Sequence, residues 1–535
     1  MKYRLIVIFA VIFSMQGAAQ ESQKSNPNVE LPDFIITGKE VINVDQAKKI
    51  PPDFVSTISG KFILPSYSPE ELQLKEFPDP LKNRLNLFDS LDYDKGWLEA
   101  DLGTYYLPAA RLVYSSPLGG GVFEGRAGAL NQREYSLNSA KNSLNAGATL
   151  YYFIKSEFPA FNGMKLKLNG DLAAENYKLY GAYFDLGPAE KRSLTTGNFS
   201  FLVNNLSNKS FIYEVNFSDQ LASLDNPDFS ENLLGFNGFA RGEFSAFNVN
   251  VNLDYKRQYI LNKMQDNSEF YFVKIRPTVG LNLSDVLRAD FGISYAQDGS
   301  HSFSAPYAAA ALHLESNVTL YGEFAPSAEF LTENYFIRLN PYLNVSTFTN
   351  LFFEKSNVLK ALLKYEYGRY FEIDGGIKYY TSDEIPYFKN NIITGAFDLA
   401  STGGNSASVF LNMLFHPGPY GIFYGTAQYE DTRDDGGKLI PYHPEWTASL
   451  NYSYDFDFGL GTAAKLYYAS KTFADLINSQ TLNSYIDLGL NFSYKLTPGF
   501  FITFKMNNLL NNRNYKWLRY ELLPFNVTGG IKVAW

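Results

Sequence analysis

From Trp97 to the C-terminus, the sequence repeatedly alternates between apolar and polar residues with a period of two. In the clearest segment the apolar positions are Phe247, Val249, Val251, Leu253 and Tyr255, and the polar positions between them are Asn248, Asn250, Asn252 and Asp254. Because successive side chains of a β-strand point to opposite faces of the sheet, this segment has one apolar and one polar face. The same alternation recurs in 287–295 and 371–379. We therefore predict an all-β chain whose strands separate an apolar from an aqueous environment.

Composition and connector lengths indicate that the apolar environment is a membrane. Aromatic residues make up 16% of the chain and charged residues only 19%, which suits strands with one face in lipid and the other in water. Beyond its first residues the chain has no apolar run of about 18 residues, the minimum for a transmembrane helix. Short connectors at 284–285, 316–317, 455–457 and 496–499 alternate with long polar ones at 175–193, 218–232, 326–356, 380–404, 430–445 and 508–525. Outer-membrane barrels have short periplasmic turns and longer external loops, so we predict a transmembrane antiparallel up-and-down β-barrel.

The strands that fit between these connectors number about 22, within a range of about 20–24 because strand ends are uncertain by a few residues. An even number places both ends of the barrel wall on the periplasmic side. The outward face of the last strand is formed by Val527, Gly529, Ile531, Val533 and Trp535. An aromatic residue at the end of an amphipathic strand resembles the signal read by the barrel-insertion machinery, and we assign that role to Trp535.

The N-terminal residues indicate export. Lys2 and Arg4 precede the apolar stretch 5–15 and the small residues 17–19, which is the pattern of a secretory signal peptide. Residues 20–95 are rich in proline, which disfavours both helices and sheet ladders. We predict a signal peptide over 1–19, a periplasmic extension over 20–95 and a barrel over 96–535, located in the outer membrane of a bacterium.

The sequence shows no pattern typical of an enzyme or a metal site. There is no Cys, and the net charge is −9, which excludes thiolate chemistry and does not suggest a nucleic-acid partner. The His residues are His301, His313, His416 and His443, none of which stands at metal-ligand spacing from another. The acidic stretch 431–437 lacks the spacing of a calcium loop, and a solvated loop is the better interpretation. We expect no catalytic residue, no metal and no cofactor.

Two motifs in the C-terminal half resemble the barrel of TonB-dependent receptors. One is Asn508-Leu509-Leu510-Asn511 with Tyr515 shortly after it, ahead of the closing strand. The other is Leu339-Asn340-Pro341 in a long external loop, where Val345-Ser346 replace the Glu common in the family. The resemblance covers roughly 97–535. Full members of that family carry a plug domain of well over a hundred residues inside the barrel, and 20–95 is too short to supply one.

The resemblance implies that the barrel passes or gates a solute, and a barrel that docks protein partners is the alternative. It places an energy-coupling segment at Asp33, Phe34, Ile35, Ile36 and Thr37. The loop 326–356 is too aromatic for a solvated loop, and we predict a gate there formed by Phe330, Tyr335, Phe336, Tyr342 and Phe352. The expected partners are outer-membrane lipid, the barrel-insertion machinery, and a TonB-like energy transducer or another periplasmic protein. The polar face carries both acidic and basic residues, so the sequence does not identify the class of solute.

Overall fold

The structure is a computed structural model that describes residues 95–535 apart from short gaps. The described ranges are 95–154, 161, 163–183, 188–205, 211–244, 247–262, 268–284, 286–315, 317–345, 350–367, 371–415 and 421–535. The expected signal peptide, the periplasmic extension and the energy-coupling segment Asp33–Thr37 lie outside the described residues. In the part of the chain that is described, no helix is long and apolar enough to cross a bilayer, an observation that does not bear on crossing by strands.

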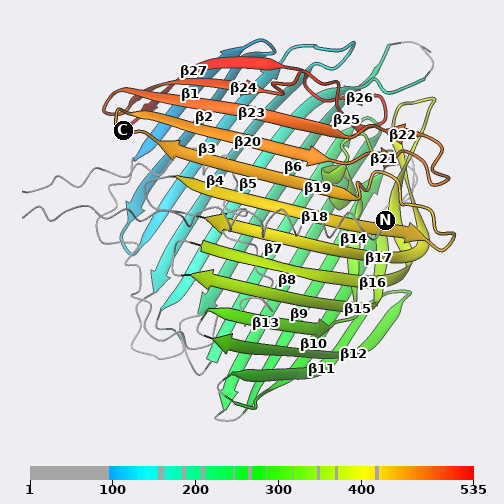
Figure 1. Ribbon diagram of the computed structural model, residues 1–535. Helices are drawn as coiled ribbons and strands as arrows, with labels where there is room; N and C mark the ends of the chain where they lie inside the picture. The colour runs from blue at the N-terminus through cyan, green and yellow to red at the C-terminus, as the bar shows by residue number, and fades with distance from the viewer. Residues whose placement is uncertain are drawn as a thin grey trace, which may run out of the picture. The chain divides into compact units, whose positions relative to one another are not determined.

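Twenty-two antiparallel strands form a closed barrel, as predicted from the alternation (Figure 1). The first eleven wall strands are β1 (Gly96–Gly103), β2 (Tyr106–Leu118), β3 (Gly121–Gln132), β4 (Lys141–Ile154), β5 (Met164–Leu179), β6 (Glu190–Asn205), β7 (Phe211–Asp225), β8 (Asp228–Phe244), β9 (Phe247–Asn262), β10 (Ser268–Asn282) and β11 (Leu287–Asp298). The other eleven are β12 (Ser302–Glu315), β13 (Val318–Phe324), β15 (Asn350–Tyr367), β16 (Phe371–Asn390), β17 (Phe397–Phe415), β18 (Ile422–Asp434), β19 (Trp446–Asp455), β20 (Leu460–Ala469), β23 (Tyr485–Thr497), β24 (Phe500–Asn507) and β27 (Asn526–Ala534).

Six short elements are not part of this wall. They are β14 (Ser327–Thr332), α5 (Glu333–Leu339), the pair β21 (Thr472–Phe473) and β22 (Thr481–Leu482), and the pair β25 (Tyr515–Trp517) and β26 (Tyr520–Glu521). As a strand, β14 pairs with the first residues of β15. All six belong to the long connectors, which gather at one edge of the barrel (Figure 1). We call this edge the external edge.

The ring closes between the first and the last strand. β1 pairs with β27 in a register that runs from Trp97↔Ala534 to Gly103↔Thr528. Next to Trp97↔Ala534, Gly96 N donates to the Trp535 carbonyl at 3.2 Å, and Trp535 N donates to the Gly96 carbonyl at 3.0 Å. Both ends of the wall therefore lie at the edge opposite the external edge, as an even strand number requires.

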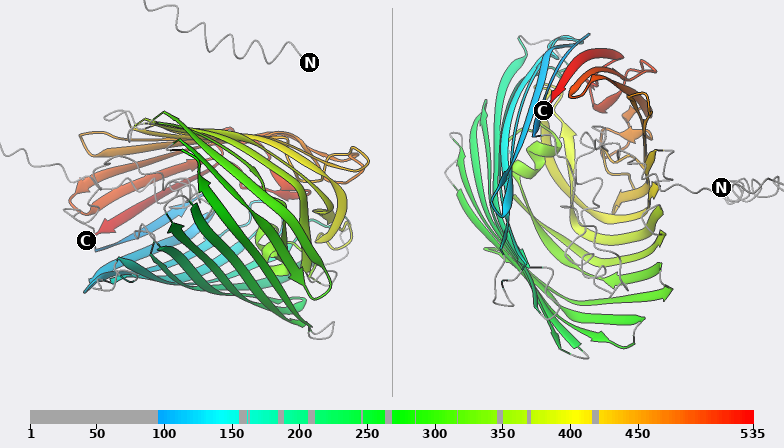
Figure 2. Two further views of the ribbon diagram at one scale, coloured as in Figure 1. Left: turned by 90° about the horizontal axis from the view of Figure 1, so that it is seen from below. Right: turned by 90° about the vertical axis from the view of Figure 1, so that its left-hand side faces the viewer.

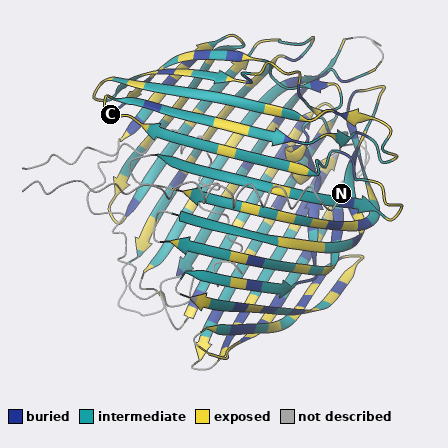
Figure 3. Ribbon diagram, viewed as in Figure 1, coloured by how far each residue is buried: buried dark blue, intermediate teal, exposed yellow. Residues whose placement is uncertain are grey.

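The apolar and polar faces of the strands are separated as the sequence predicts. On β9, Val249 and Val251 are more than a third exposed, whereas Asn248 and Asn250 are buried. Asn250 Nδ2 donates to Asn248 Oδ1 at 2.9 Å and to Thr278 Oγ1 of β10 at 3.1 Å, so the polar faces form a network on the luminal side of the wall. β10, β11 and β27 alternate in the same way over part of their length, while many other strand residues have intermediate exposure (Figure 3).

Several strands extend further towards the external edge than predicted. The expected loop 218–232 is a hairpin in which only Asn226 and Pro227 separate β7 from β8, and the expected loop 380–404 contains the end of β16 and the start of β17. The alternation of apolar side chains marks only the lipid-facing part of a strand. Beyond the bilayer both faces of a strand are hydrated or contact loops. The ladder of backbone hydrogen bonds therefore continues there without the alternation of apolar and polar side chains.

We predict that a charge on the outer face is far more costly than a charge on the luminal face. Val251→Lys should destabilise the inserted barrel by about 2–4 kcal/mol if the position is near the midplane of the bilayer. Asn252→Lys, one residue on, should cost much less because Asn252 lines a luminal recess with Glu214 and Asp254. Urea titration of barrels refolded in lipid vesicles measures both. A larger loss from Asn252→Lys would reverse the assignment of the faces.

We also predict the side of the membrane on which each edge lies. An epitope tag inserted after Gly436, in the connector between β18 and β19, should be labelled by antibody on intact cells. A tag after Asp457, in the short turn between β19 and β20, should be labelled only after the outer membrane is permeabilised. Labelling of the second tag alone on intact cells would invert the topology.

Candidate functional site

One long connector folds into the barrel instead of standing away from it. We call residues 326–353, of which 346–349 are not described, the mouth segment. It continues from β13 into β14, turns through α5 and returns into β15, with β14 paired to β15 from Ser327↔Lys355 to Thr332↔Asn350. Thr332 caps the start of α5 by accepting a hydrogen bond from Tyr335 N, and Pro341 follows the C-cap residue Asn340. The helix lies inside the ring of strands (Figure 2, right).

The β14–β15 hairpin packs against the luminal face of the wall at β8 and β10 to β12. The Phe330 ring stacks on Phe272 of β10, with a centroid distance of 5.7 Å, and Phe352 meets the same ring at 6.0 Å. These aromatic residues form a buried cluster with Leu233, Ala296, Phe303 and Ala328. Lys256 Nζ of β9 donates to the Phe330 carbonyl at 3.5 Å. The hairpin is therefore attached to the wall mainly by aromatic contacts.

The part of the mouth segment after α5 is bound to two opposite walls. The buried Arg192 of β6 donates from Nη1 to the Leu343 carbonyl at 2.6 Å, and Tyr177 of β5 donates from its hydroxyl to the Pro341 carbonyl at 2.5 Å. On the other side Asn344 N donates to the Phe397 carbonyl of β17 at 2.7 Å. β5 and β17 are the fifth and sixteenth strands in the ring of 22. They face each other, so the segment crosses the mouth of the barrel.

Apolar side chains from many external connectors meet the mouth segment. We call this group the mouth cluster; its buried members are Tyr177, Leu179, Leu194, Leu224, Phe229, Ile260, Leu331, Phe336, Ile337, Leu343, Val345, Leu351, Phe353, Ile385, Phe388, Ala396, Phe397, Leu399, Ile440, Trp517 and Tyr520. Phe397 lies with its ring centroid 5.4 Å from Trp517 and 6.0 Å from Tyr520. The cluster joins the segment to β5, β6, β17 and the β25–β26 turn.

One ion pair fixes the hairpin near the lumen. Lys355 Nζ lies 2.8 Å from Glu329 Oε1. Burial opposes ionisation of Glu329, but Lys355, helped by Lys274 and Lys256, outweighs it and holds the pKa of this carboxyl below its usual value. Glu329 is therefore a carboxylate, and it ties β14 to β15.

The structure places the five predicted gate residues in different surroundings. Phe330 and Phe352 lie in the wall cluster around Phe272, whereas Phe336 is buried in the mouth cluster and Tyr342 packs against it. Tyr335 is 45% exposed, and its ring meets the edge of Phe336 at a centroid distance of 5.1 Å. Trp535 stands at the closing seam.

Sequence reasoning missed the residues that receive the mouth segment. Arg192, Tyr177 and Phe397 lie on strands far from it in sequence, and nothing in their local pattern marks them. Among the described residues there is no group of three or more His, Cys, Asp or Glu that could hold a metal ion. The stretch 431–435 forms the end of β18 and a turn, in which Asp434 accepts from Lys438 N at 2.6 Å.

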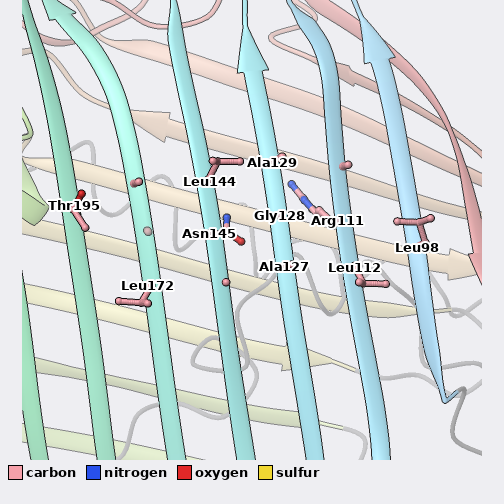
Figure 4. Close-up of a pocket in the computed structure, with 14 residues that line it drawn as sticks. Leu98, Arg111, Leu112, Ala127, Gly128, Ala129, Leu144, Asn145, Leu172 and Thr195 are labelled. Carbon is pink, nitrogen blue, oxygen red and sulfur yellow. The ribbon is translucent and has the colours of Figure 1, made fainter.

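Two depressions on the wall differ in chemistry. A recess of about 160 Å³ on the luminal side is lined by Glu214, Asp254, Lys274 and Arg276 among others. Because these side chains carry both charges, the recess favours neither anionic nor cationic solutes. A second, apolar depression of about 500 Å³ spans β1 to β6 (Figure 4). Its apolar lining residues include Leu98, Leu112, Leu144 and Leu172, which lie on the outer face and are exposed. The second depression is therefore a lipid-facing surface.

We predict that Arg192 holds the mouth segment in place. Arg192→Ala should weaken docking of residues 341–345 by about 1.5–3 kcal/mol, because a charged hydrogen bond to a buried carbonyl is lost. Lys191→Ala is the matched control, since Lys191 is the adjacent, exposed residue. The rate at which an external protease cleaves the mouth segment on intact cells measures the difference. Equal rates for the two variants would show that the hydrogen bond does not secure the segment.

No protein-family model and no curated protein matches the sequence. Solved structures match the fold. The ferric-catecholate import receptor Fiu of E. coli K12 aligns with a TM-score of 0.61 at 11% identity, over 83% of this chain and 82% of Fiu. The iron transporter FrpB of Neisseria meningitidis aligns with a TM-score of 0.62 at 10% identity, over 82% and 81% of the chains.

The ferripyoverdine receptor of Pseudomonas aeruginosa aligns with a TM-score of 0.59 at 12% identity, over 82% of this chain and 72% of that receptor. At such identities the similarity is one of fold. These alignments indicate the same fold as the wall of 22 strands and its apolar outer face. The chain is an outer-membrane β-barrel with the barrel fold of TonB-dependent receptors.

Proposed function

We propose that this barrel passes a solute across the outer membrane and that the mouth segment restricts the passage. The observation that carries the proposal is the attachment of the segment to both β5–β6 and β17, on opposite sides of the mouth. A barrel of this strand number encloses a wide lumen, and known examples keep it plugged. A segment that crosses the mouth and buries Phe336, Ile337 and Leu343 can serve the same purpose.

The similar structures support transport over other functions. They are described as an import receptor for ferric catecholates, an iron transporter and a receptor for ferripyoverdine. We infer a related activity for this chain, in which the solute enters from outside and a TonB-like transducer engages residues 33–37. The solute class stays open because the luminal recess carries both acidic and basic side chains.

Deleting residues 328–350 tests the proposal. The barrel should still insert, because β13 pairs with the later part of β15, from Val318↔Tyr365 to Phe324↔Leu359, without help from the deleted residues. Single-channel conductance in planar bilayers should rise several-fold, because the side chains that cross the mouth are gone.

The matched control is deletion of Gly436 and Gly437 from the exposed turn after β18, which contributes no residue to the mouth cluster. This variant should conduct like the parent barrel. Unchanged conductance in a correctly inserted 328–350 deletion would contradict the gating role. It would favour the alternative that the barrel docks protein partners through its external loops or its periplasmic extension.

A further inference from the structure

Two glutamates are buried together where the mouth segment meets the wall. Glu231 of β8 is 0% exposed, and Glu333, the first residue of α5, is 1% exposed. Glu231 Oε2 accepts a hydrogen bond from Asn334 N at 2.8 Å. Its other oxygen, and both oxygens of Glu333, are buried without a hydrogen-bond partner among the described residues. Three carboxyl oxygens are thus buried without a hydrogen-bond partner among the described residues, which is costly if both groups are charged.

The groups around this pair do not neutralise it by direct contact. The nearest cation on the mouth segment is Arg338, but its Nε donates to Asn334 Oδ1 at 2.9 Å and its Nη2 to the Gly197 carbonyl at 3.5 Å. β14 contributes the Thr332 hydroxyl and β9 contributes the amide of Gln258, both of which lie beside Glu231. Asn350 of β15 donates to Gln258 Oε1 at 3.4 Å. All three of these groups are neutral.

Two carboxylates cannot both ionise in such a site. Burial, together with the charge of Glu231, raises the pKa of Glu333 to about 10. When α5 leaves the wall and Glu333 becomes hydrated, its pKa should return to about 4.3. The docked state therefore holds a proton at neutral pH that the released state gives up.

We propose that Glu231 and Glu333 form a proton-dependent latch, in which the mouth segment stays docked while Glu333 is protonated and is released more readily as the pH rises. The inference rests on the proposed function only for the consequence of release, which is a wider passage. The direction of this pH dependence follows from the linkage between proton binding and docking. The stabilisation of the docked state is complete below the pKa of the released carboxyl, and it is lost progressively as the pH rises towards the pKa of the docked one.

The natural chain has no Cys, so a single introduced thiol can report docking. Val345→Cys places it at a site that is 1% exposed in the mouth cluster, and Leu137→Cys places a reference thiol at a site that is 78% exposed. Maleimide labelling of Val345→Cys, divided by that of Leu137→Cys at the same pH, removes the intrinsic pH dependence of the thiol. When closing is faster than labelling, this ratio follows the opening equilibrium.

We expect the ratio to rise between pH 6 and pH 8, by up to about a hundredfold if each opening releases one proton. Glu333→Gln in the Val345→Cys background keeps the shape of the side chain but cannot ionise, so the rise of its ratio with pH should be greatly reduced. Glu384→Gln is the matched control, because Glu384 is exposed on β16, and it should retain the full dependence. The heat-modifiable migration of each variant on gels verifies that the barrel is folded.

A ratio independent of pH in Val345→Cys, or an unchanged dependence in Glu333→Gln, would overturn the latch. Opening by a chelator at constant pH would also overturn it, because the pair would then hold a divalent cation instead of a proton. Labelling reports docking whether or not the barrel conducts. A pH-dependent ratio combined with unchanged conductance in the 328–350 deletion would leave the latch standing and remove the proposed gate.

Discussion

The closing of the backbone ladder between β1 and β27 is the constraint on which the rest of the structure depends. Inside a bilayer there is no water to satisfy backbone N–H and C=O groups, so an open sheet edge is excluded. The pairing from Trp97↔Ala534 to Gly103↔Thr528 removes both edges at once. Closure with 22 strands then sets the width of the lumen. A wide lumen must be filled or restricted, and the mouth segment crosses it.

The sequence predicts what the bilayer imposes and little of what the lumen adds. Lipid contact imposes strict alternation, as in 247–255. This alternation was enough to predict the number of strands, the face of each strand that contacts lipid, and the last strand as the one that closes the barrel. Long-range contacts leave no such trace. Arg192 and Leu343 are 151 residues apart, and neither has a neighbourhood that identifies the other. The aromatic content of 326–356 predicted burial of this loop, but the walls that receive it follow only from the register of the whole barrel.

The wall and the mouth segment are stabilised by different interactions. The wall depends on backbone hydrogen bonds that cannot be exchanged for water within the membrane. The mouth segment depends on side chains at the wet edge, chiefly ring contacts such as Phe330 on Phe272 and single hydrogen bonds such as Arg192 to Leu343. It also buries carboxyl oxygens without partners, which reduces its net stability. A segment with these properties can open while the wall stays intact.

The positions of the two ends of the barrel constrain how such opening could be driven. The chain enters the wall at Gly96, beside Trp535, at the edge with short connectors, whereas the mouth cluster lies at the external edge. Work applied to the wall at Gly96 would therefore act at the edge opposite Glu333 and Arg192. A rigid wall transmits little of that work to the other edge, because its backbone ladder has one arrangement. Opening of the mouth segment is then better controlled locally, by a solute that displaces its ring contacts or by the protonation of its buried carboxyls.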